Sequence, residues 1–245
     1  MSHLHRLVEQ AVADARARSA QPLPAPPGPV RPFPRAGLIA EVKRASPSRG
    51  AINPSLDPAS LARAYERGGA AAVSVLTDRV GFGGSLDDLR AARDAVGLPI
   101  LRKDFIATGQ QVREARAYGA DAVLLIAGAA PPETLRELRV LARELGLTVL
   151  FEVHAEAELE IAAACQPDLL GINARDLRTL EVHPDTFGRL APLARGIAPL
   201  VAESGVKTAA DVRRYRELGA SLVLVGEALS SARDPEAAVR DLVRS

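Results

Sequence analysis

The sequence is poor in cysteine and has no long apolar run, and each shortage excludes a class of protein. A single cysteine, Cys165, rules out an intramolecular disulfide and favours a reducing compartment. The longest uncharged apolar run, residues 122–132, is far shorter than the roughly 20 residues of a membrane helix. The first ten residues lack the apolar core of a signal peptide. We therefore expect a soluble cytoplasmic protein with no membrane partner.

Excess charge of one sign is also missing. The 245 residues include 31 basic and 30 acidic side chains, which gives a formal net charge of +1. Surfaces that hold nucleic acid usually show a strong basic excess. The sequence therefore predicts no nucleic-acid partner.

Lysine is scarce among the basic residues. Only Lys43, Lys103 and Lys207 occur, so the other 28 of the 31 basic residues are arginine. Arginine stays protonated in proteins, whereas lysine can exchange a proton when its surroundings shift its pKa. A lysine retained in such a chain is a candidate for proton transfer, with chance retention as the alternative for any single one.

From residue 37 onward, short apolar runs rich in β-branched residues alternate with helical patterns. Near-continuous apolar runs are typical of parallel strands buried on both faces. Eight strand–helix units in about 210 residues predict an α/β fold, a closed (β/α)8 TIM barrel. An open doubly wound sheet is the alternative, but its usual G-x-G-x-x-G turn is replaced here by EVKRASPSRG. The eight runs are 38–42, 72–76, 99–101, 122–126, 148–151, 169–172, 199–202 and 222–225.

The segment before the barrel has a different pattern. Apolar residues at helical spacing predict a helix over residues 3–19, and the proline-rich QPLPAPPGPVRPFP that follows must run extended. We expect one domain over residues 1–245, with an accessory helix and linker over 1–36 and the barrel over 37–245. A loose tail over the first 20 residues is the alternative.

Charged residues close several of the predicted strands, where the active sites of such barrels lie. Glu41 and Lys43 end the first run, Lys103 ends the third, and Glu152 ends the fifth. Lysines beside glutamates supply proton donors and acceptors that tune each other's pKa. The pattern indicates acid–base chemistry on a carbonyl or enamine. A structural ion pair at the rim is the alternative for any one of these residues.

The loops after the later strands add polar and glycine-rich segments. Asn173 and Arg175 follow the sixth run and Glu203 ends the seventh. The segments AESG at 202–205 and VGEA at 225–228 offer backbone amides near a helix start, an arrangement that binds anions. Barrels often hold a phosphate after strands seven and eight. We therefore predict a small phosphorylated substrate.

Metal and serine-hydrolase chemistry lack their usual patterns. The histidines show no ligand spacing, so we predict no metal site. His154 is expected to point away from Glu152, in a loop or behind the site, and Ser204 lies in ESG rather than in a G-x-S-x-G elbow. The four histidines are His3, His5, His154 and His183.

These residues and their order resemble the indole-3-glycerol phosphate synthase family over about residues 37–230. The resemblance implies closure of the pyrrole ring, decarboxylation and dehydration of 1-(2-carboxyphenylamino)-1-deoxyribulose 5-phosphate, without cofactor or metal. It also implies a cytoplasmic carboxy-lyase of tryptophan biosynthesis, with enzymes of that pathway as candidate partners. The motifs are IAEVKRASPSRG, SVLTD, FGGS, LRKDF, LFEVH, GINARDL, AESGV and LVGEAL.

The resemblance also implies roles for individual residues. Lys103 matches the general acid and Glu152 its partner base or relay, while Glu41 and Lys43 match residues of substrate binding and dehydration. We expect Glu227 to bind phosphate through its backbone N–H with its carboxylate turned away. The matching substrate-binding residues are Ser46, Phe82, Phe105, Leu124, Asn173, Arg175, Leu177, Glu203 and Ser204, and the matching phosphate-binding residues are Gly205, Gly226 and Glu227.

Three other functions stay open at this point. A sugar-phosphate isomerase would need a cysteine–aspartate pair at strand ends, but Cys165 precedes the sixth run. An aldolase would use Lys103 as a Schiff-base nucleophile. A non-catalytic phosphate-binding barrel would keep its function without that lysine.

Overall fold

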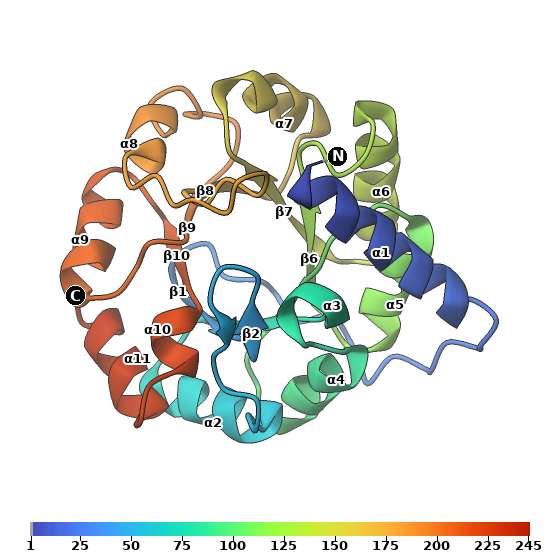
Figure 1. Ribbon diagram of the computed structural model, residues 1–245, viewed down its shortest axis with the longest axis horizontal. Helices are drawn as coiled ribbons and strands as arrows, with labels where there is room; N and C mark the ends of the chain where they lie inside the picture. The colour runs from blue at the N-terminus through green and yellow to red at the C-terminus, as the bar shows by residue number, and fades with distance from the viewer. Residues whose placement is uncertain (1) are drawn as a thin grey trace.

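The computed structural model describes residues 2–245, so Met1 lies outside the described part of the chain (Figure 1). Its long strands close into an eight-stranded parallel barrel in the order β1-β10-β9-β8-β7-β6-β5-β4, in which β1 pairs with both β10 and β4. The predicted (β/α)8 barrel is confirmed, and the open sheet is excluded. The barrel strands are β1 (Gly37–Val42), β4 (Ala72–Leu76), β5 (Ile100–Lys103), β6 (Ala122–Ile126), β7 (Thr148–Val153), β8 (Leu169–Asn173), β9 (Leu200–Glu203) and β10 (Leu222–Val225).

Helices cover the outside of this barrel. Each of α2, α5 and α9 begins at a side-chain cap, and Thr108 and Thr208 form capping boxes with residues three positions on. The helices that follow the strands are α2 (Pro58–Gly68), α3 (Arg79–Phe82), α4 (Leu86–Ala95), α5 (Gly109–Ala117), α6 (Pro132–Glu144), η1 (Glu156–Glu158), α7 (Leu159–Cys165), α8 (Thr186–Leu190), α9 (Ala209–Glu217), α10 (Glu227–Ser230) and α11 (Pro235–Val243). The small hairpin of β2 (Ala45–Ser46) and β3 (Gly50–Ala51) was not predicted, because two-residue strands carry no periodicity.

The alternation of side chains along each strand divides the core into two layers. Leu150 packs inside the barrel with Ile39 and Leu101, whereas its neighbour Phe151 packs in the outer layer under the helices. Because side chains alternate with a period of two, Glu152 returns to the inside of the barrel at the carboxyl end of β7. The same apolar pattern that builds the core therefore places a carboxylate in the barrel mouth.

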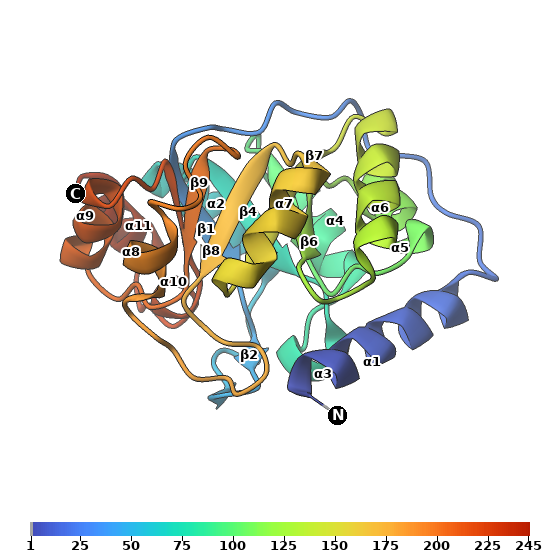
Figure 2. The same cartoon turned by 90° about the horizontal axis from the view of Figure 1, so that it is seen from above.

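The N-terminal segment is a helix followed by an extended linker, as predicted. α1 (His3–Arg18) begins at Ser2, whose Oγ accepts a hydrogen bond from the N–H of His5 at 3.2 Å. Its buried residues Leu7 and Val8 belong to the same apolar cluster as the barrel interior. Figure 2 shows α1 on the side of β2 and α3, with the linker running along the outside toward the opposite end. The loose-tail alternative is therefore excluded.

Buried arginine–aspartate pairing holds the linker to the barrel. Asp121 accepts from Arg93 Nη1 at 2.6 Å and from the N–H of Arg31 at 2.6 Å. Arg93 Nη2 also donates to the carbonyl of Pro29 at 2.7 Å. Because Arg93 and Asp121 are both buried, each neutralises the charge of the other, which would be costly to bury alone.

Among residues 2–245, no helix combines the length and apolar character needed to span a bilayer.

Candidate active site

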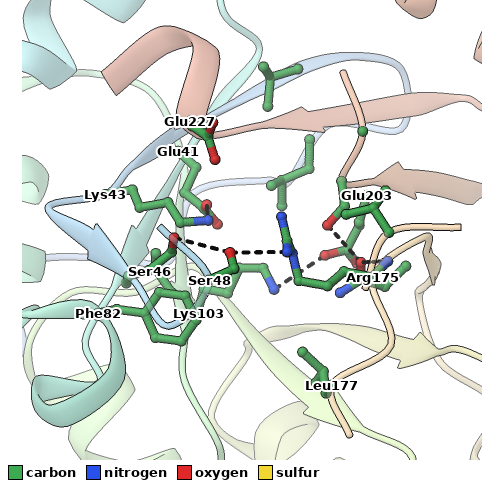
Figure 3. A pocket seen from close by; sticks show the side chains of 18 of the residues that line it. Glu41, Lys43, Ser46, Ser48, Phe82, Lys103, Arg175, Leu177, Glu203 and Glu227 are labelled. Carbon is green, nitrogen blue, oxygen red and sulfur yellow. Dashed lines mark hydrogen bonds and ion pairs between the residues drawn. The ribbon is translucent and has the colours of Figure 1, made fainter. Parts of the chain in front are cut away.

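A cavity of about 730 Å³ opens at the carboxyl ends of the barrel strands (Figure 3). Every residue predicted for the site lines it, including the four candidates for acid–base chemistry, Glu41, Lys43, Lys103 and Glu152. Their side chains come from β1, the residue after it, β5 and β7. Because all strands run parallel, these ends meet at one rim. The fold thus brings together the residues that the sequence places far apart.

Lys103 lies between two buried carboxylates. Its Nζ donates to Glu152 Oε2 at 3.0 Å and lies 3.3 Å from Glu203 Oε2. Burial alone would lower the pKa of Lys103, but the charges of Glu152 and Glu203 raise it above its ordinary value. The ammonium group therefore keeps its proton at neutral pH and holds it inside the cavity.

The two glutamates beside Lys103 differ in charge state. Burial alone would raise the pKa of Glu152, but Lys103, with His154 and Asn173, holds it well below its usual range. Burial and the neighbouring charge of Glu152 raise the pKa of Glu203 to about 8. Glu152 is therefore the more strongly ionised partner of the ammonium group, and Glu203 holds its proton more tightly than an ordinary carboxyl group.

Glycine makes room for the carboxylates in two places. A Cβ at Gly171 would clash with Glu203 Oε1, and a Cβ at Gly226 would clash with Glu41 Oε1. Any side chain at these positions would displace a carboxylate from the cavity wall. Steric crowding by a carboxylate of the site therefore explains why GINARDL and LVGEAL carry glycine at these positions.

Asn173 orients the groups around Glu152. Its Nδ2 donates to Glu152 Oε1 at 3.1 Å, while its Oδ1 accepts from Ser204 Oγ at 2.7 Å and from the N–H of Arg175 at 2.9 Å. Ser204 has a φ of +68°, a strained conformation for a residue with a side chain. The loop after β9 is thus fixed to the end of β8 by a hydrogen bond through the site.

An aromatic wall and a second lysine also line the cavity. The rings of Phe82 and Phe105 are 6.2 Å apart between centroids. Lys43 Nζ lies 5.4 Å from the centroid of the Phe82 ring and 3.4 Å from Glu41 Oε1. A flat apolar surface beside a cation suits an aryl ring that carries a carboxylate.

The glycine-rich end of the cavity contains a pair that the sequence did not reveal. Glu227, at the start of α10, is paired with Arg49 Nη1, and both residues line the cavity. The carboxylate expected to turn away is therefore held at the rim with its charge offset by a guanidinium. Gly205, with a φ of +79°, and Gly226 line the same end.

One expectation is wrong. His154 does not point away from Glu152, because its Nε2 lies 3.0 Å from Glu152 Oε1. β7 ends at Val153, and the N–H of His154 donates to Glu158 Oε2 at 2.6 Å. The turn that follows the strand therefore brings the imidazole back against the buried carboxylate.

Leu7 and Arg49 are two of the lining residues that lay outside the predicted set, for different reasons. Leu7 of α1 lines the cavity, but no motif connects that helix to the barrel mouth. Arg49 follows the SPS motif, and only its pairing with Glu227 shows where it lies. Within residues 2–245, no group of three or more His, Cys, Asp or Glu side chains is placed to hold a metal ion.

Ionised lysine and glutamate side chains at the carboxyl ends of parallel barrel strands define an enzyme of the (β/α)8 class. Comparison with known proteins identifies the family. The protein-family model of indole-3-glycerol phosphate synthase matches residues 31–242, and the chain belongs to that family. Its members are carboxy-lyases of tryptophan biosynthesis.

Relatives in the curated proteins support the same assignment. The indole-3-glycerol phosphate synthase of Nocardioides sp. is 57% identical over 94% of this chain and 88% of its own length. That of Mycolicibacterium smegmatis is 52% identical over 86% of this chain and 77% of its own length.

Solved structures at low identity share the fold. A 3-hexulose-6-phosphate synthase from Salmonella typhimurium superposes with a TM-score of 0.67 at 16% identity, over 85% of this chain and 97% of that one. A thiamine phosphate pyrophosphorylase from Pyrococcus furiosus superposes with a TM-score of 0.64 at 17% identity, over 86% and 95%.

Proposed function

We propose that the cavity converts 1-(2-carboxyphenylamino)-1-deoxyribulose 5-phosphate into indole-3-glycerol phosphate, carbon dioxide and water. The observation that carries this proposal is the half-buried Lys103, held 3.0 Å from Glu152 at the mouth of a barrel of this family. A cavity of about 730 Å³ lies within the range of about 300–1,000 Å³ that encloses small molecules.

Lys103 is the general acid of ring closure in this proposal. The ring carbon that carries the carboxyl group attacks the ketone carbon, and the ketone oxygen takes a proton from Nζ to become a hydroxyl group. The carboxyl group then leaves as carbon dioxide, and its bonding electrons restore the aromatic ring. The 3.0 Å contact with Glu152 supports this role because it orients Nζ and stabilises the protonated form.

Dehydration completes the reaction. The new hydroxyl group leaves as water with a second proton, and the neighbouring carbon that is bonded to nitrogen loses a proton. We assign this half to Glu41 and Lys43, which are 3.4 Å apart in the same cavity. Two protons enter and one leaves, so each turnover consumes one proton as the carboxylate departs as neutral gas.

The rest of the cavity supplies binding in this proposal. Phe82 and Phe105 flank the aryl ring together with Leu124 and Leu177. Arg175, whose Nη1 donates to Ser48 Oγ at 3.1 Å, faces the substrate carboxylate. Guanidinium groups bind carboxylates through two parallel hydrogen bonds, which would fix the ring for attack.

The phosphate binds at the opposite end. Backbone N–H groups of Gly205, Gly226 and Glu227 surround the anion, as amides in glycine-rich turns commonly do. Arg49 supports this placement because it pairs with the Glu227 carboxylate and offsets its repulsion of phosphate. Ser46, which is buried at the rim, completes the substrate contacts.

The absence of tryptophan makes the direct test simple. The protein has no indole fluorescence of its own, so the product appears against a low background. Wild type mixed with the carboxyphenylamino substrate should show rising indole fluorescence, and Lys103→Ala should lose it while still binding the substrate. Binding without product in a folded wild-type protein would instead favour the non-catalytic barrel.

The same preparation tests the other enzymatic alternatives. An aldolase would form a borohydride-reducible adduct on Lys103, whereas the proposed acid forms none. The isomerase alternative would need Cys165, which is buried at the end of α7 and lines neither cavity of the barrel mouth. Cys165→Ala should therefore keep its activity.

The proposal includes the cellular setting. The single cysteine and the biosynthetic family support a cytoplasmic location, and enzymes of tryptophan biosynthesis are its candidate partners. Residues 1–36 then act as the accessory segment of the barrel in one domain. Co-purification of pathway enzymes with the tagged protein at stoichiometric yield tests the partnership.

A further inference from the structure

His154 lies between the substrate cavity and a second cavity behind it. The second cavity measures about 310 Å³ and lies between the segments that follow β7 and β8. His154 lines the second cavity, Glu152 lines the first, and Asn173 lines both. The imidazole and the carboxylate therefore form a continuous path from one cavity to the other.

Glu152 uses its two oxygens on the two sides of this path. Oε2 accepts from Lys103 Nζ at 3.0 Å, facing the substrate cavity. Oε1 lies 3.0 Å from His154 Nε2 and accepts from Asn173 Nδ2 at 3.1 Å. A proton that arrives at Oε1 can thus reach Lys103 once the carboxyl group rotates about its Cγ–Cδ bond, without movement of the backbone.

The imidazole has a second contact on its outer side. Nδ1 lies 3.5 Å from Glu158 Oε2, and the Glu158 side chain is 24% exposed. The rim of the second cavity includes Glu156 and Arg178, which are exposed, so this cavity is open to water. The His154 side chain itself is only 8% exposed. The imidazole ring therefore lies between the solvent in the second cavity and the buried Glu152 carboxylate, and it is close to both.

The reaction requires a supply of protons to Lys103. If the proposed function holds, each turnover consumes one proton, and Lys103 has given one up when the product forms. Substrate in the first cavity blocks water from that side, because the ligand occupies the mouth through which Lys103 would be reached. A route from behind would restore the acid while the mouth is occupied.

We propose that His154 relays protons from the second cavity through Glu152 to Lys103. In each step one N–H or O–H bond breaks as the next forms: Nε2 gives its proton to Glu152 Oε1, rotation about the Cγ–Cδ bond turns that O–H toward Lys103, and the same proton then passes to Nζ. Rotation of the ring about its Cβ–Cγ bond then turns the vacated nitrogen toward the second cavity, where it regains a proton from water. No electrons change hands, and the one proton taken from solvent equals the one consumed.

The charges around the ring suit this task. Glu152 from β7, Glu158 from η1 and Asp176 from the segment after β8 face His154, and all three are acidic. Burial alone would lower the pKa of His154, but Glu152 and Glu158 raise it to about 10. His154 therefore carries the proton that it would pass on throughout the neutral pH range.

The test compares His154→Gln with wild type in the fluorescence assay between pH 7 and 9. A glutamine amide can still donate to Glu152 but cannot pass a proton onward. We expect kcat to fall about tenfold or more at pH 9 and less at pH 7, with KM unchanged. In His154→Ala, added imidazole should restore kcat by entering the emptied space. His183→Gln is the matched control, because His183 lines the second cavity but does not contact Glu152.

The outcomes separate the relay from the activity itself. A wild-type protein that forms no product would overturn the proposed function and the relay with it. An active wild type with an unaffected His154→Gln variant would overturn the relay alone. A fall in kcat that is the same at every pH and is not rescued by imidazole would assign His154 to packing and would equally overturn the relay.

Discussion

Removing the arginine that anchors α1 should loosen the helix over the active site without unfolding the barrel. Arg18 donates to Glu114 through Nε at 3.0 Å and Nη2 at 2.9 Å. Glu114 belongs to α5 and is buried, whereas the Arg18 side chain is 37% exposed. Since Leu7 of the same helix lines the substrate cavity, this anchor connects the stability of α1 to the binding of substrate.

The size of the effect follows from what remains after the change. Exposed ion pairs contribute about 0–1 kcal/mol, and breaking a buried pair costs about 3–5 kcal/mol when a charge is left alone. In Arg18→Ala, Glu114 keeps Arg102 Nη1 at 3.3 Å, so its charge stays paired. We therefore expect a loss of about 1–2 kcal/mol in the free energy of unfolding. Glu114→Ala removes both the Arg18 bridge and the contact to Arg102, but the fully buried Arg102 keeps Asp104 Oδ2 at 2.7 Å, so this change should cost about 2–3 kcal/mol.

Urea unfolding followed by circular dichroism measures both losses, and the fluorescence assay measures KM. Arg18→Ala should raise KM several-fold with a small change in kcat, because the helix contributes to the cavity wall and not to the proton transfers. Arg16→Ala is the matched control, since Arg16 is exposed on the same turn. Equal effects of Arg18→Ala and Arg16→Ala on both quantities would refute the reasoning.

Two further substitutions test the burial of carboxylates. Burial raises the pKa of Asp78 to about 6, so its ionised form destabilises the fold above pH 6 and this cost vanishes below pH 4. Asp78→Asn keeps the acceptor for the N–H of Gly81. In urea titrations it should raise the free energy of unfolding by about 2–3 kcal/mol at pH 8 but not at pH 4. Equal gains at the two pH values would contradict this reasoning. Gly226→Ala places a methyl group against the Glu41 carboxylate and should lower kcat/KM at least tenfold, and wild-type kinetics would exclude the proposed position of Glu41.

The sequence was sufficient to predict the barrel because a buried parallel strand has a simple pattern. Short, near-continuous apolar runs such as Ala122–Ile126 are typical of strands covered on both faces, and all eight runs became barrel strands within two residues. Much of the site followed from the same rule. Once Leu150 faces inward, the period of two also turns Glu152 inward at the carboxyl end of β7, where barrels hold their active sites.

Other parts of the site depended on contacts that no local pattern encodes. The inward turn of His154 depends on Glu158 accepting from the backbone of a turn that follows the strand. The pair of Arg49 and Glu227 joins residues 178 positions apart, and neither has a periodicity that indicates its partner. Such contacts arise from the closure of the barrel and the lengths of its loops, which sequence spacing does not determine.

The central claim is that Lys103 and Glu152 work as one acid–base unit, and a double-mutant cycle tests it most directly. Lys103→Met and Glu152→Gln should each lower kcat by about 10² to 10⁴, measured by indole fluorescence at saturating substrate. Because each group needs the other at 3.0 Å, the double variant should lose about as much as the worse single variant. Losses that multiply, or a Lys103→Met variant close to wild type, would contradict the account.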